Sequence, residues 1–561
     1  MSLSFRRRPR FAIRRRADAA SARAKLDTLP DRPLISVVMP TYETPPRYLA
    51  DAIESVRRQD YPEWELCIAD DGSSRSGTLR ALNRAASSDP RIRVTRLERN
   101  RGISTATNAA LELCRGELVA FLDHDDALTP DALLEMASAF SEEGCDIAYS
   151  DSDKITPGGR RKDPFLKPDW SPVYALGAMY IGHLLTVRRS LVEEVGGLDP
   201  AFDTIQDFEL MMRLSERTER IHHVPKILYH WRAIPGSIAA GADEKDGVPE
   251  LQARAVSEHL GRLGLPVRAE PHPTITHRTR LRPLPAERPT VSVVVPARGR
   301  DEMLRSCLEA VCERTSYPEL ELIAVEGDWA ERAPGPLPGD AASVRYEGHS
   351  FSPARMASLG AERASGPYLL FLDEDTEVLE PDWVDQLVML SRLPRVGACA
   401  PVLSRPDGRV ESAGFAVGLR EPAAPAFQGS RDDGDGYYGN LACAREVAAV
   451  SMDCMLIRSS LFAEAGGFDP DFSRQFHDLD LCMELGRRGL SSVCSPSPRT
   501  FTHRTEAVRR RDFDVIDRAL FVERRFEALR SGDPYFNPGF ARASADYMPA
   551  PPGVASVRSL R

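Results

Sequence analysis

Two stretches of the chain share one hydrophobic pattern. Residues 35–40 (ISVVMP) and 291–296 (VSVVVP) are unbroken, largely β-branched apolar runs, which are typical of parallel strands covered on both faces. After the first run, residues 49, 52, 53 and 56 are apolar at helical spacing and predict an amphipathic helix. Further apolar runs at 65–70, 91–97 and 118–123, with a helical segment at 104–114, continue the alternation. This alternation predicts an α/β sheet that binds its ligands at the carboxyl ends of the strands.

The same short sequence motifs recur in both halves of the chain, in the same order. YPEWEL at 61–66 returns as YPELEL at 317–322, and FLDHDD at 121–126 returns as FLDEDT at 371–376. GGLDPAFD at 196–203 likewise returns as GGFDPDFS at 466–473. A period near 250 residues is a domain, because solenoid repeats run to roughly 20–50 residues. The sequence therefore predicts two tandem domains of like fold.

Composition shifts suggest where the domains begin and end. A basic arm covers 1–31, and a segment rich in Pro and Arg, which we interpret as a linker, covers 268–290. The expected organisation is therefore an arm at 1–31, a first domain at 32–267, a linker at 268–290, a second domain at 291–535 and a tail at 536–561.

Charge and cysteine content exclude several classes of protein. A net charge of −10 argues against nucleic acid as the main partner, since a basic face is needed to meet phosphates. The ten cysteines show no CxxC pair or zinc-finger spacing, and several lie in apolar runs. Reduced core thiols in a cytoplasmic protein are the favoured interpretation. No apolar run approaches the roughly 18–20 residues of a membrane span.

The basic arm has two open interpretations. Arg6, Arg7, Arg8 and Arg10 begin a run of basic residues with Phe5 interleaved. The arm is either solvated or drawn to anionic lipid, at about 1 kcal/mol per basic residue near the surface. The second interpretation would place the protein peripherally on the inner face of the cytoplasmic membrane.

An acidic cluster ends one predicted strand. Asp123, Asp125 and Asp126 repel one another unless a cation is present, and carboxylate oxygens suit Mg²⁺ or Mn²⁺, which also bind diphosphate. The alternative is a solvated turn in which Asp126 or Thr129 caps the following helix. The D-x-D pattern alone does not decide between them.

The full series of motifs resembles family 2 glycosyltransferases of the GT-A fold. The series is VVMPTYE, IADDGSS, GISTATNAAL, FLDHDDAL, GGLDPAF, QDFELMMRL and YHWR, over about 34–240. Residues of about 290–505 resemble the same family, and PDGRVESAGFAVG resembles the second domain of bacterial O-antigen or capsule-type tandem transferases, including rhamnosyltransferases. The resemblance implies two α/β domains, Rossmann-like, that bind nucleotide-diphospho-sugars. It also implies an inverting hexosyl or deoxyhexosyl transferase that needs Mn²⁺ or Mg²⁺, a UDP- or dTDP-sugar donor and a glycan or lipid-linked glycan acceptor.

The resemblance also implies a role for each matching residue of the first half. Nucleotide-sugar contacts are expected from Pro40, Thr41, Glu43, Asp70, Asp71, Asn108 and Asp123. Asp123 and Asp125 would bind the metal, His230 would lie near the diphosphate or metal, and Asp207 would be the general base. A carboxylate opposite the leaving group can take the acceptor proton and invert the anomeric centre. Asp207 has a simpler alternative as a helix N-cap, His230 as a core histidine and Asn108 as an exposed polar residue.

The second half keeps part of this set. Asp373, Asp375 and His503 hold the metal-binding positions and Asp478 holds the base position, whereas Asp70-Asp71-Gly72 has become Glu326-Gly327-Asp328. The second domain is either active with altered nucleotide contacts, which we favour, or a polysaccharide-binding domain without catalysis. We expect residues 397–453 to contact the acceptor.

Other functions fit the sequence less well. A sugar-phosphate nucleotidyltransferase would need a Gly-rich basic loop near the N-terminus, and a Rossmann dehydrogenase would need GxGxxG after the first strand. Neither pattern is present. A non-catalytic scaffold that binds nucleotide-sugar or glycan is the alternative to a transferase.

Overall fold

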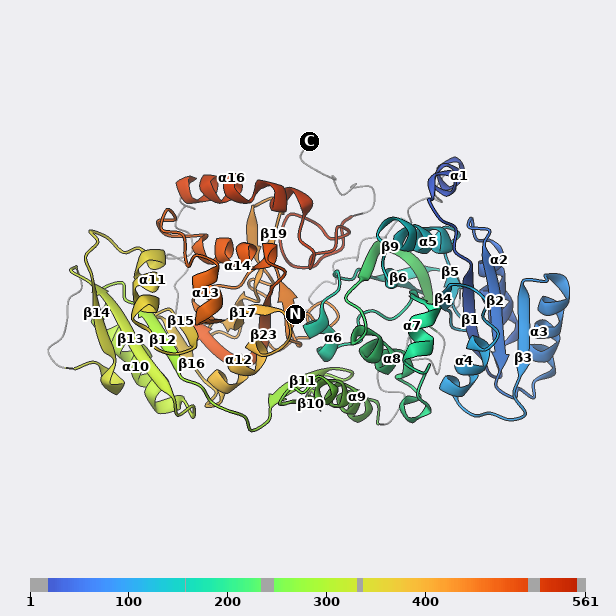
Figure 1. The fold of residues 1–561 in the computed structure, drawn as a ribbon, viewed down its shortest axis with the longest axis horizontal. Coiled ribbons are helices and arrows are strands. Elements are labelled where there is room, and N and C mark those ends of the chain that lie inside the picture. Colours follow the sequence, from blue (N-terminus) through green and yellow to red (C-terminus); the bar gives the residue numbers. More distant parts are fainter. Residues whose placement is uncertain (1–18, 157, 234–246, 330–335, 503–514, 552–561) are drawn as a thin grey trace, which may run out of the picture.

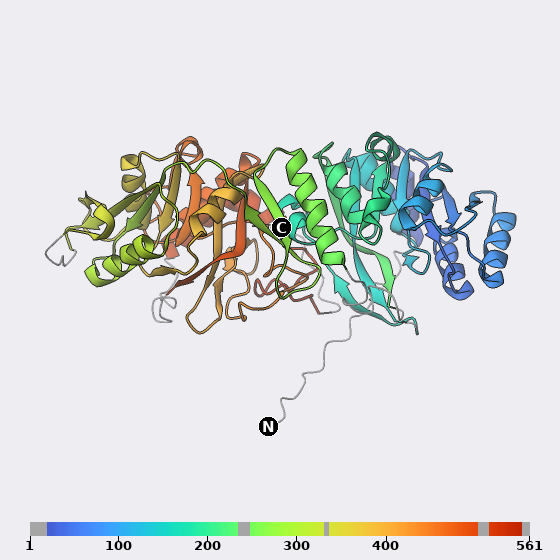
Figure 2. The ribbon, with the colours of Figure 1, turned by 90° about the horizontal axis from the view of Figure 1, so that it is seen from below.

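The computed structural model consists of two α/β domains placed side by side along its long axis (Figures 1 and 2). It describes residues 19–156, 158–233, 247–329, 336–502 and 515–551. Domain 1 contains the strands up to β9, and domain 2 contains those from β12 onward. The prediction of two tandem α/β domains is confirmed.

The sheet of domain 1 has the order β3-β2-β1-β4-β8-β6-β9-β5, with β7 paired to β6. Its strands are β1 (Ile35–Thr41), β2 (Trp64–Asp70), β3 (Ile92–Arg96), β4 (Leu118–Phe121), β5 (Ala127–Leu128), β6 (Ile147–Ile155), β7 (Arg161–Phe165), β8 (Leu185–Arg188) and β9 (Ile221–Arg232). β1 runs parallel to both β2 and β4, whereas β8 is antiparallel to β4. The carboxyl ends of β1, β2 and β4 therefore lie at one edge.

Helices cover both faces of this sheet. The predicted stripe of Leu49, Ala52, Ile53 and Val56 is buried on α2 (Pro46–Arg57). It packs in one core with Ile35, Val37 and Met39, which point to one face of β1. Val38 points to the other face, toward α4 (Ile103–Leu111). The remaining helices are α1 (Ala19–Thr28), α3 (Ser76–Ser88), α5 (Ala132–Glu142), α6 (Pro172–Gly177), α7 (Arg189–Glu194), the 3-10 helix η1 (Pro200–Phe202), α8 (Gln206–Ser215) and α9 (Val248–Arg262).

Domain 2 repeats the strand order of domain 1. Its sheet runs β14-β13-β12-β15-β22-β17-β23-β16, with β18 and β21 attached. The strands are β12 (Val291–Pro296), β13 (Leu320–Gly327), β14 (Ala342–Tyr346), β15 (Tyr368–Leu372), β16 (Thr376–Val378), β17 (Val396–Ser404), β18 (Val410–Ser412), β21 (Arg445–Val447), β22 (Cys454–Arg458) and β23 (Ser491–Thr502), with β19 (Phe415–Val417) and β20 (Ala423–Pro425) in a separate ribbon. The helices are α10 (Asp301–Arg314), η2 (Pro338–Asp340), α11 (Pro353–Arg363), α12 (Trp383–Ser391), α13 (Ser459–Glu464), α14 (His477–Arg487) and α16 (Val515–Ser531).

Two segments are more ordered than their sequence suggested. The predicted linker contains the antiparallel hairpin of β10 (Val267–Pro271) and β11 (Thr279–Pro283). The predicted tail contributes to the core, with Phe536, Phe540 and Tyr547 buried. Pro- and Gly-rich composition hid these contacts because they are made by a few well-spaced aromatic residues.

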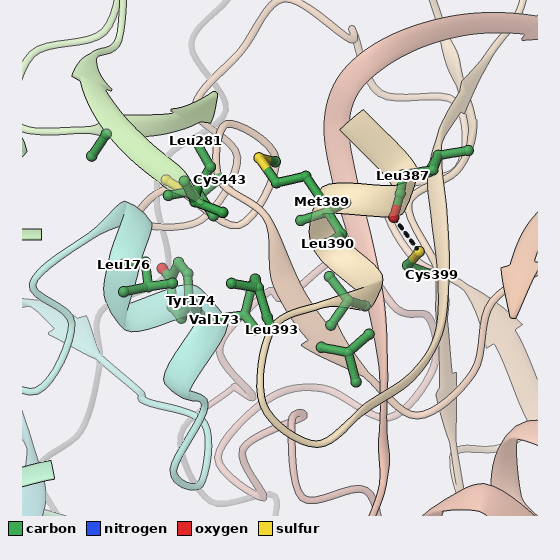
Figure 3. Close-up of a cluster of buried hydrophobic side chains, with 14 of the residues drawn as sticks. Val173, Tyr174, Leu176, Leu281, Leu387, Met389, Leu390, Leu393, Cys399 and Cys443 are labelled. Carbon is green, nitrogen blue, oxygen red and sulfur yellow. Dashed lines mark hydrogen bonds between the residues drawn. The ribbon is translucent and has the colours of Figure 1, made fainter. Parts of the chain in front are cut away.

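The two domains share a buried apolar cluster (Figure 3). Val173, Tyr174 and Leu176 of α6 lie together with Leu281 of β11 and with residues of α12. A hydrogen bond at this cluster also links the domains, because the Tyr174 hydroxyl donates to the Tyr438 carbonyl at 2.5 Å. Tyr438 belongs to the segment predicted to contact the acceptor, so part of that segment contacts domain 1. Its role toward an acceptor stays a prediction.

A buried polar network also joins the domains. Asn537 donates from Nδ2 to the Asp151 carboxylate at 3.0 Å and to the Lys167 carbonyl at 2.8 Å. The Lys167 ammonium, which is fully buried, donates to the carbonyls of Ser150, Ile181 and His183. Burial lowers the pKa of Lys167 to about 7. The C-terminal segment of domain 2 is thus linked to the loop that carries His183.

The N-terminal arm lies mainly outside the described residues. Its last part forms α1, where Lys25 pairs with Glu135 at 2.7 Å. Within the described ranges, no helix is long and apolar enough to cross a bilayer. Membrane contact through the arm stays a prediction.

The stability of the protein should depend on pH through Glu446, which lies at the contact between the domains. This buried carboxylate accepts hydrogen bonds from the Val173 and Tyr174 N–H groups, at 2.8 and 3.2 Å, and burial raises its pKa from 4.5 to about 7. The folded state then holds the proton to a higher pH than the unfolded chain does, so stability should fall as pH rises from 4.5 to 7. We expect the free energy of unfolding to lose roughly 3 kcal/mol relative to Glu446→Gln over this window. Thermal unfolding of both proteins at pH 5 and pH 8 checks this, and a constant difference would contradict it.

Candidate active site

Polar residues at the carboxyl ends of β1 and β2 hold the adjacent loops together. Asp70 is fully buried and pairs with Arg96 at 3.2 Å. Asp71 accepts hydrogen bonds from the N–H groups of Arg101 and Gly102, at 2.8 and 3.0 Å, and so shapes the entry to α4. Burial without such donors would be costly. The two carboxylates are therefore bound to the protein itself at the edge where a nucleotide is predicted.

Thr41 and Glu43 extend the same edge from β1. The buried Thr41 hydroxyl lies 2.6 Å from that of Thr44. Glu43 accepts a hydrogen bond from the Ser74 hydroxyl at 2.9 Å, and hydrogen bonds from Ser74 hold the pKa of Glu43 below its usual range. This residue remains ionised at neutral pH and links the β1 loop to the β2 loop.

One pocket brings together three titratable side chains from separate parts of the chain. Asp123 follows β4, His183 precedes β8 and Asp207 opens α8, and all three line it. Pro40 from β1 and apolar side chains from α4 and α8 complete the wall. The tertiary fold therefore brings the first D-x-D carboxylate and the predicted base to one cavity.

His183 is a site residue that sequence reasoning missed. Its Nε2 lies 3.3 Å from Asp123 Oδ2, and its ring stacks on Tyr229. The surrounding IGHLL has no recognisable motif. Only the antiparallel insertion of β8 beside β4 places this histidine at the carboxylate, so no local signal identified it.

Asp207 lies in a partly desolvated position at the start of α8. Burial raises its pKa, the neighbouring His183 lowers it and the negative charge of Asp123 raises it again. The N–H of Phe208 donates to Oδ1 at 2.9 Å. A raised pKa makes a carboxylate a stronger base, which suits a proton acceptor.

The other two carboxylates of the motif differ in environment. Asp126 is buried, accepts from the Tyr229 hydroxyl at 2.6 Å and the Arg232 N–H at 2.7 Å, and has a pKa well above its usual value because of burial. Burial also raises the pKa of Asp125, and the charge of Asp123 adds to this. The hydrogen bonds of Asp126 thus come from the protein itself. Asp123 and Asp125 are neighbouring carboxylates, and a bound cation would relieve the repulsion between them.

Asn108 and His230 make contacts that their predicted roles did not include. Asn108 donates to the Leu198 carbonyl at 2.8 Å and accepts from the Leu198 N–H at 2.9 Å, so its amide fixes the GGLDP loop. His230 Nδ1 lies 2.6 Å from an Asp153 carboxylate oxygen. Their contacts with a nucleotide-sugar or a metal stay predictions.

In domain 2 the corresponding carboxylates are engaged by the protein. Asp373 pairs with the Arg298 guanidinium, and the Asp375 N–H donates to Asp373 Oδ1 at 3.3 Å. Asp478 accepts from the N–H groups of Met452 and Leu479, at 3.1 and 2.9 Å. The predicted position of His503 lies outside the described residues.

Protein side chains alone do not form a complete metal site within the part of the chain that the structure describes. Among the described residues, no three His, Cys, Asp or Glu side chains are grouped closely enough to hold an ion by themselves. Asp123 and Asp125 nevertheless fit Mg²⁺ or Mn²⁺, because such ions often bind through one or two carboxylates and complete their coordination with substrate phosphates and water.

Comparison with known proteins assigns the family. Residues 36–196 and 292–462, together more than half of the chain, match the model described as glycosyl transferase family 2. The chain belongs to glycosyl transferase family 2. Each matched region contains the strands of one of the two sheets of equal strand order apart from its last strand, β9 or β23, so the prediction of tandem GT-A domains is confirmed.

Bacterial relatives match along nearly the whole chain. An uncharacterised protein, y4gI, of Sinorhizobium fredii is 35% identical over 93% of this chain and 59% of its own length. The O-antigen biosynthesis protein RfbC of Myxococcus xanthus is 33% identical over 95% of this chain and 42% of its own length. The chain thus spans three fifths or less of these relatives.

Among solved structures, one match covers about the length of one domain of this chain. TarS of S. aureus, residues 1–349 in complex with UDP-GlcNAc, aligns with 40% of this chain and 66% of its own, at 21% identity and a TM-score of 0.34.

Asn108→Ala should destabilise domain 1. The substitution removes both hydrogen bonds to Leu198 and leaves a half-buried N–H and carbonyl without partners, at a cost of about 1–3 kcal/mol for such groups. Thermal unfolding should show a lower Tm, and Asn108→Asp, which can still accept from Leu198, should lose less. An unchanged Tm with weaker nucleotide-sugar binding would instead favour the predicted contact with the donor.

Proposed function

We propose that domain 1 transfers a sugar from a nucleoside-diphospho-sugar to a glycan acceptor, with inversion, in bacterial surface polysaccharide synthesis. The supporting observation is the shared pocket of Asp123 and Asp207. A family 2 chain with a carboxylate for the leaving group and a second carboxylate for the acceptor has both components that the reaction needs. The name of the relative RfbC supports the O-antigen context.

Asp207 is the proposed general base. The acceptor hydroxyl forms its bond to the anomeric carbon as that carbon's bond to the diphosphate oxygen breaks, and the hydroxyl proton passes to the Asp207 carboxylate. Attack from the face opposite the leaving group inverts the anomeric centre, as in inverting glycosidases. The desolvation that raises the pKa of Asp207 increases its basicity.

Asp123 and Asp125 are the proposed ligands of Mn²⁺ or Mg²⁺ in domain 1. When bound, the ion would supply Lewis-acid stabilisation to the charge of the departing nucleoside diphosphate. His183 holds the Asp123 carboxylate from the pocket side. We further propose that Thr41, Glu43, Asp70 and Asp71 form the nucleotide edge, since they lie at the carboxyl ends of β1 and β2.

A scaffold that binds nucleotide-sugar or glycan without turnover is the competing function. The scaffold is favoured by domain 2, where Asp373 pairs with Arg298 and Asp478 accepts a hydrogen bond from the Met452 N–H. Domain 1 argues against a scaffold, because Asp207, the proposed base, lines a pocket. Turnover measurements separate the two.

Asp207→Asn should lower the transfer rate by about 10²–10⁴-fold, the usual contribution of a general base. Asparagine has the same shape and can still accept from the Phe208 N–H, so the fold should persist. The measurement is release of nucleoside diphosphate from a panel of UDP-, dTDP- and GDP-sugars in the presence of Mn²⁺ and lipid-linked glycan. Asp478→Asn is the matched substitution in domain 2. Full activity of Asp207→Asn would contradict the assignment, and absence of turnover in the wild type with every donor would favour the scaffold.

A further inference from the structure

The register of the two sheets shows which residues of the domains correspond. Ile35 pairs with Leu118 in domain 1, and Val291 pairs with Tyr368 in domain 2. Counting along these strands, Asp373 takes the place of Asp123. By the same count Arg298, which follows β12, takes the place of Tyr42. An exposed aromatic residue of domain 1 is thus replaced by a cation in domain 2.

Arg298 is bound at the domain 2 D-x-D by three contacts. Its guanidinium pairs with Asp373, its N–H donates to Glu374 at 3.0 Å, and its guanidinium carbon lies 5.1 Å from the centre of the Phe351 ring. The Asp373 side chain is only 5% exposed, whereas that of Asp123 is 34% exposed. An arginine stays charged at every physiological pH. A fixed positive charge therefore lies against the carboxylate that would bind the ion.

The neighbour on the adjacent antiparallel strand also differs between the domains, since a carboxylate side chain replaces the imidazole. The position of His183 is held by Asp453, whose carbonyl accepts from the Asp373 N–H at 3.0 Å. This counterpart follows from the pairing of β8 with β4 and of β22 with β15. The Asp453 carbonyl thus fixes the main chain of Asp373, and the Arg298 guanidinium binds its carboxylate.

The nucleotide edge of domain 2 is also altered. Gly327 stands where domain 1 has Asp71, and the Trp329 indole packs so closely on Gly327 that a Cβ there would overlap the ring. Trp329 in turn meets Tyr346 edge to face, with ring centres 6.1 Å apart. The carboxylate that shapes the loop into α4 in domain 1 is replaced by an aromatic side chain.

We propose that the Arg298 guanidinium takes the place of the divalent cation in domain 2. The Asp373 and Asp375 carboxylates then bind no Mn²⁺ or Mg²⁺, unlike the expectation drawn from the D-x-D pattern. Each chain holds one metal–nucleotide site, in domain 1, and that last statement rests on the proposed function of domain 1. A dication is excluded because it would have to displace a half-buried, ring-packed guanidinium from its carboxylate.

The first test counts metal sites on the full chain. Mn²⁺ binding is followed by electron paramagnetic resonance with saturating UDP, dTDP or GDP in parallel. We expect one Mn²⁺ per wild-type chain, lost in Asp125→Asn and retained in Asp375→Asn. Two ions per wild-type chain, with one lost in Asp375→Asn, would overturn the proposal.

The second test restores the domain 1 residue at the same position. Arg298→Tyr should raise the count by one Mn²⁺ per chain, and the added site should disappear in the double variant Arg298→Tyr with Asp375→Asn. Arg300→Tyr, at an exposed arginine two residues away, is the matched control and should leave the count unchanged. No gain in a folded Arg298→Tyr chain would overturn the proposal.

A third measurement needs neither metal nor nucleotide. Arg298→Met and Asp373→Asn should each lower the Tm, and the double variant should lower it no further than the more damaging single change, because the two residues stabilise each other. Additive losses would overturn the pairing. If the wild type binds no Mn²⁺ while Arg298→Tyr binds one and the cycle is non-additive, the function proposed for domain 1 fails and this inference stands.

Discussion

Desolvated carboxylates at the carboxyl edge of each sheet constrain the rest of this structure. A buried carboxylate is tolerated only with hydrogen-bond donors or a cation, because the loss of hydration is otherwise too costly. In domain 1, Asp71 is satisfied by backbone N–H groups and Asp126 by Tyr229 and Arg232. These bonds fix the loops around the pocket and leave Asp123 and Asp207 facing it.

The contact between the domains also depends on buried polar groups that must be hydrogen-bonded. Lys167 holds the carbonyls of the loop that carries His183, and Asn537 from the far end of the chain bonds to Asp151 and to the Lys167 carbonyl. Domain 2 therefore supports the loop beside Asp123, whatever its own chemistry. A polar network of this kind is stable only when all its members are satisfied, which favours one relative placement of the domains.

The two domains show how one fold can keep a motif and change its chemistry. The strand order is the same in both, and the D-x-D and the acid at the start of the corresponding helix are present in both. What differs is the partner of each carboxylate: His183 for Asp123, and Arg298 for Asp373. Fold and motif do not by themselves determine function, because a single neighbouring cation alters what a carboxylate pair can bind.

The sequence by itself determined the tandem α/β organisation, the strands at 35–40 and 291–296, the stripe on α2 and the candidate acids, because hydrophobic periodicity and local motifs are encoded by neighbouring residues. Only the tertiary structure decided which side chains these acids contact and which distant segments pack together. His183 reaches Asp123 through the insertion of β8 beside β4, Arg298 reaches Asp373 across parallel strands, and Phe540 and Asn537 join a core from a segment that looks like a tail. Such pairings depend on sheet order and on contacts over hundreds of residues, for which a single sequence has no local signal.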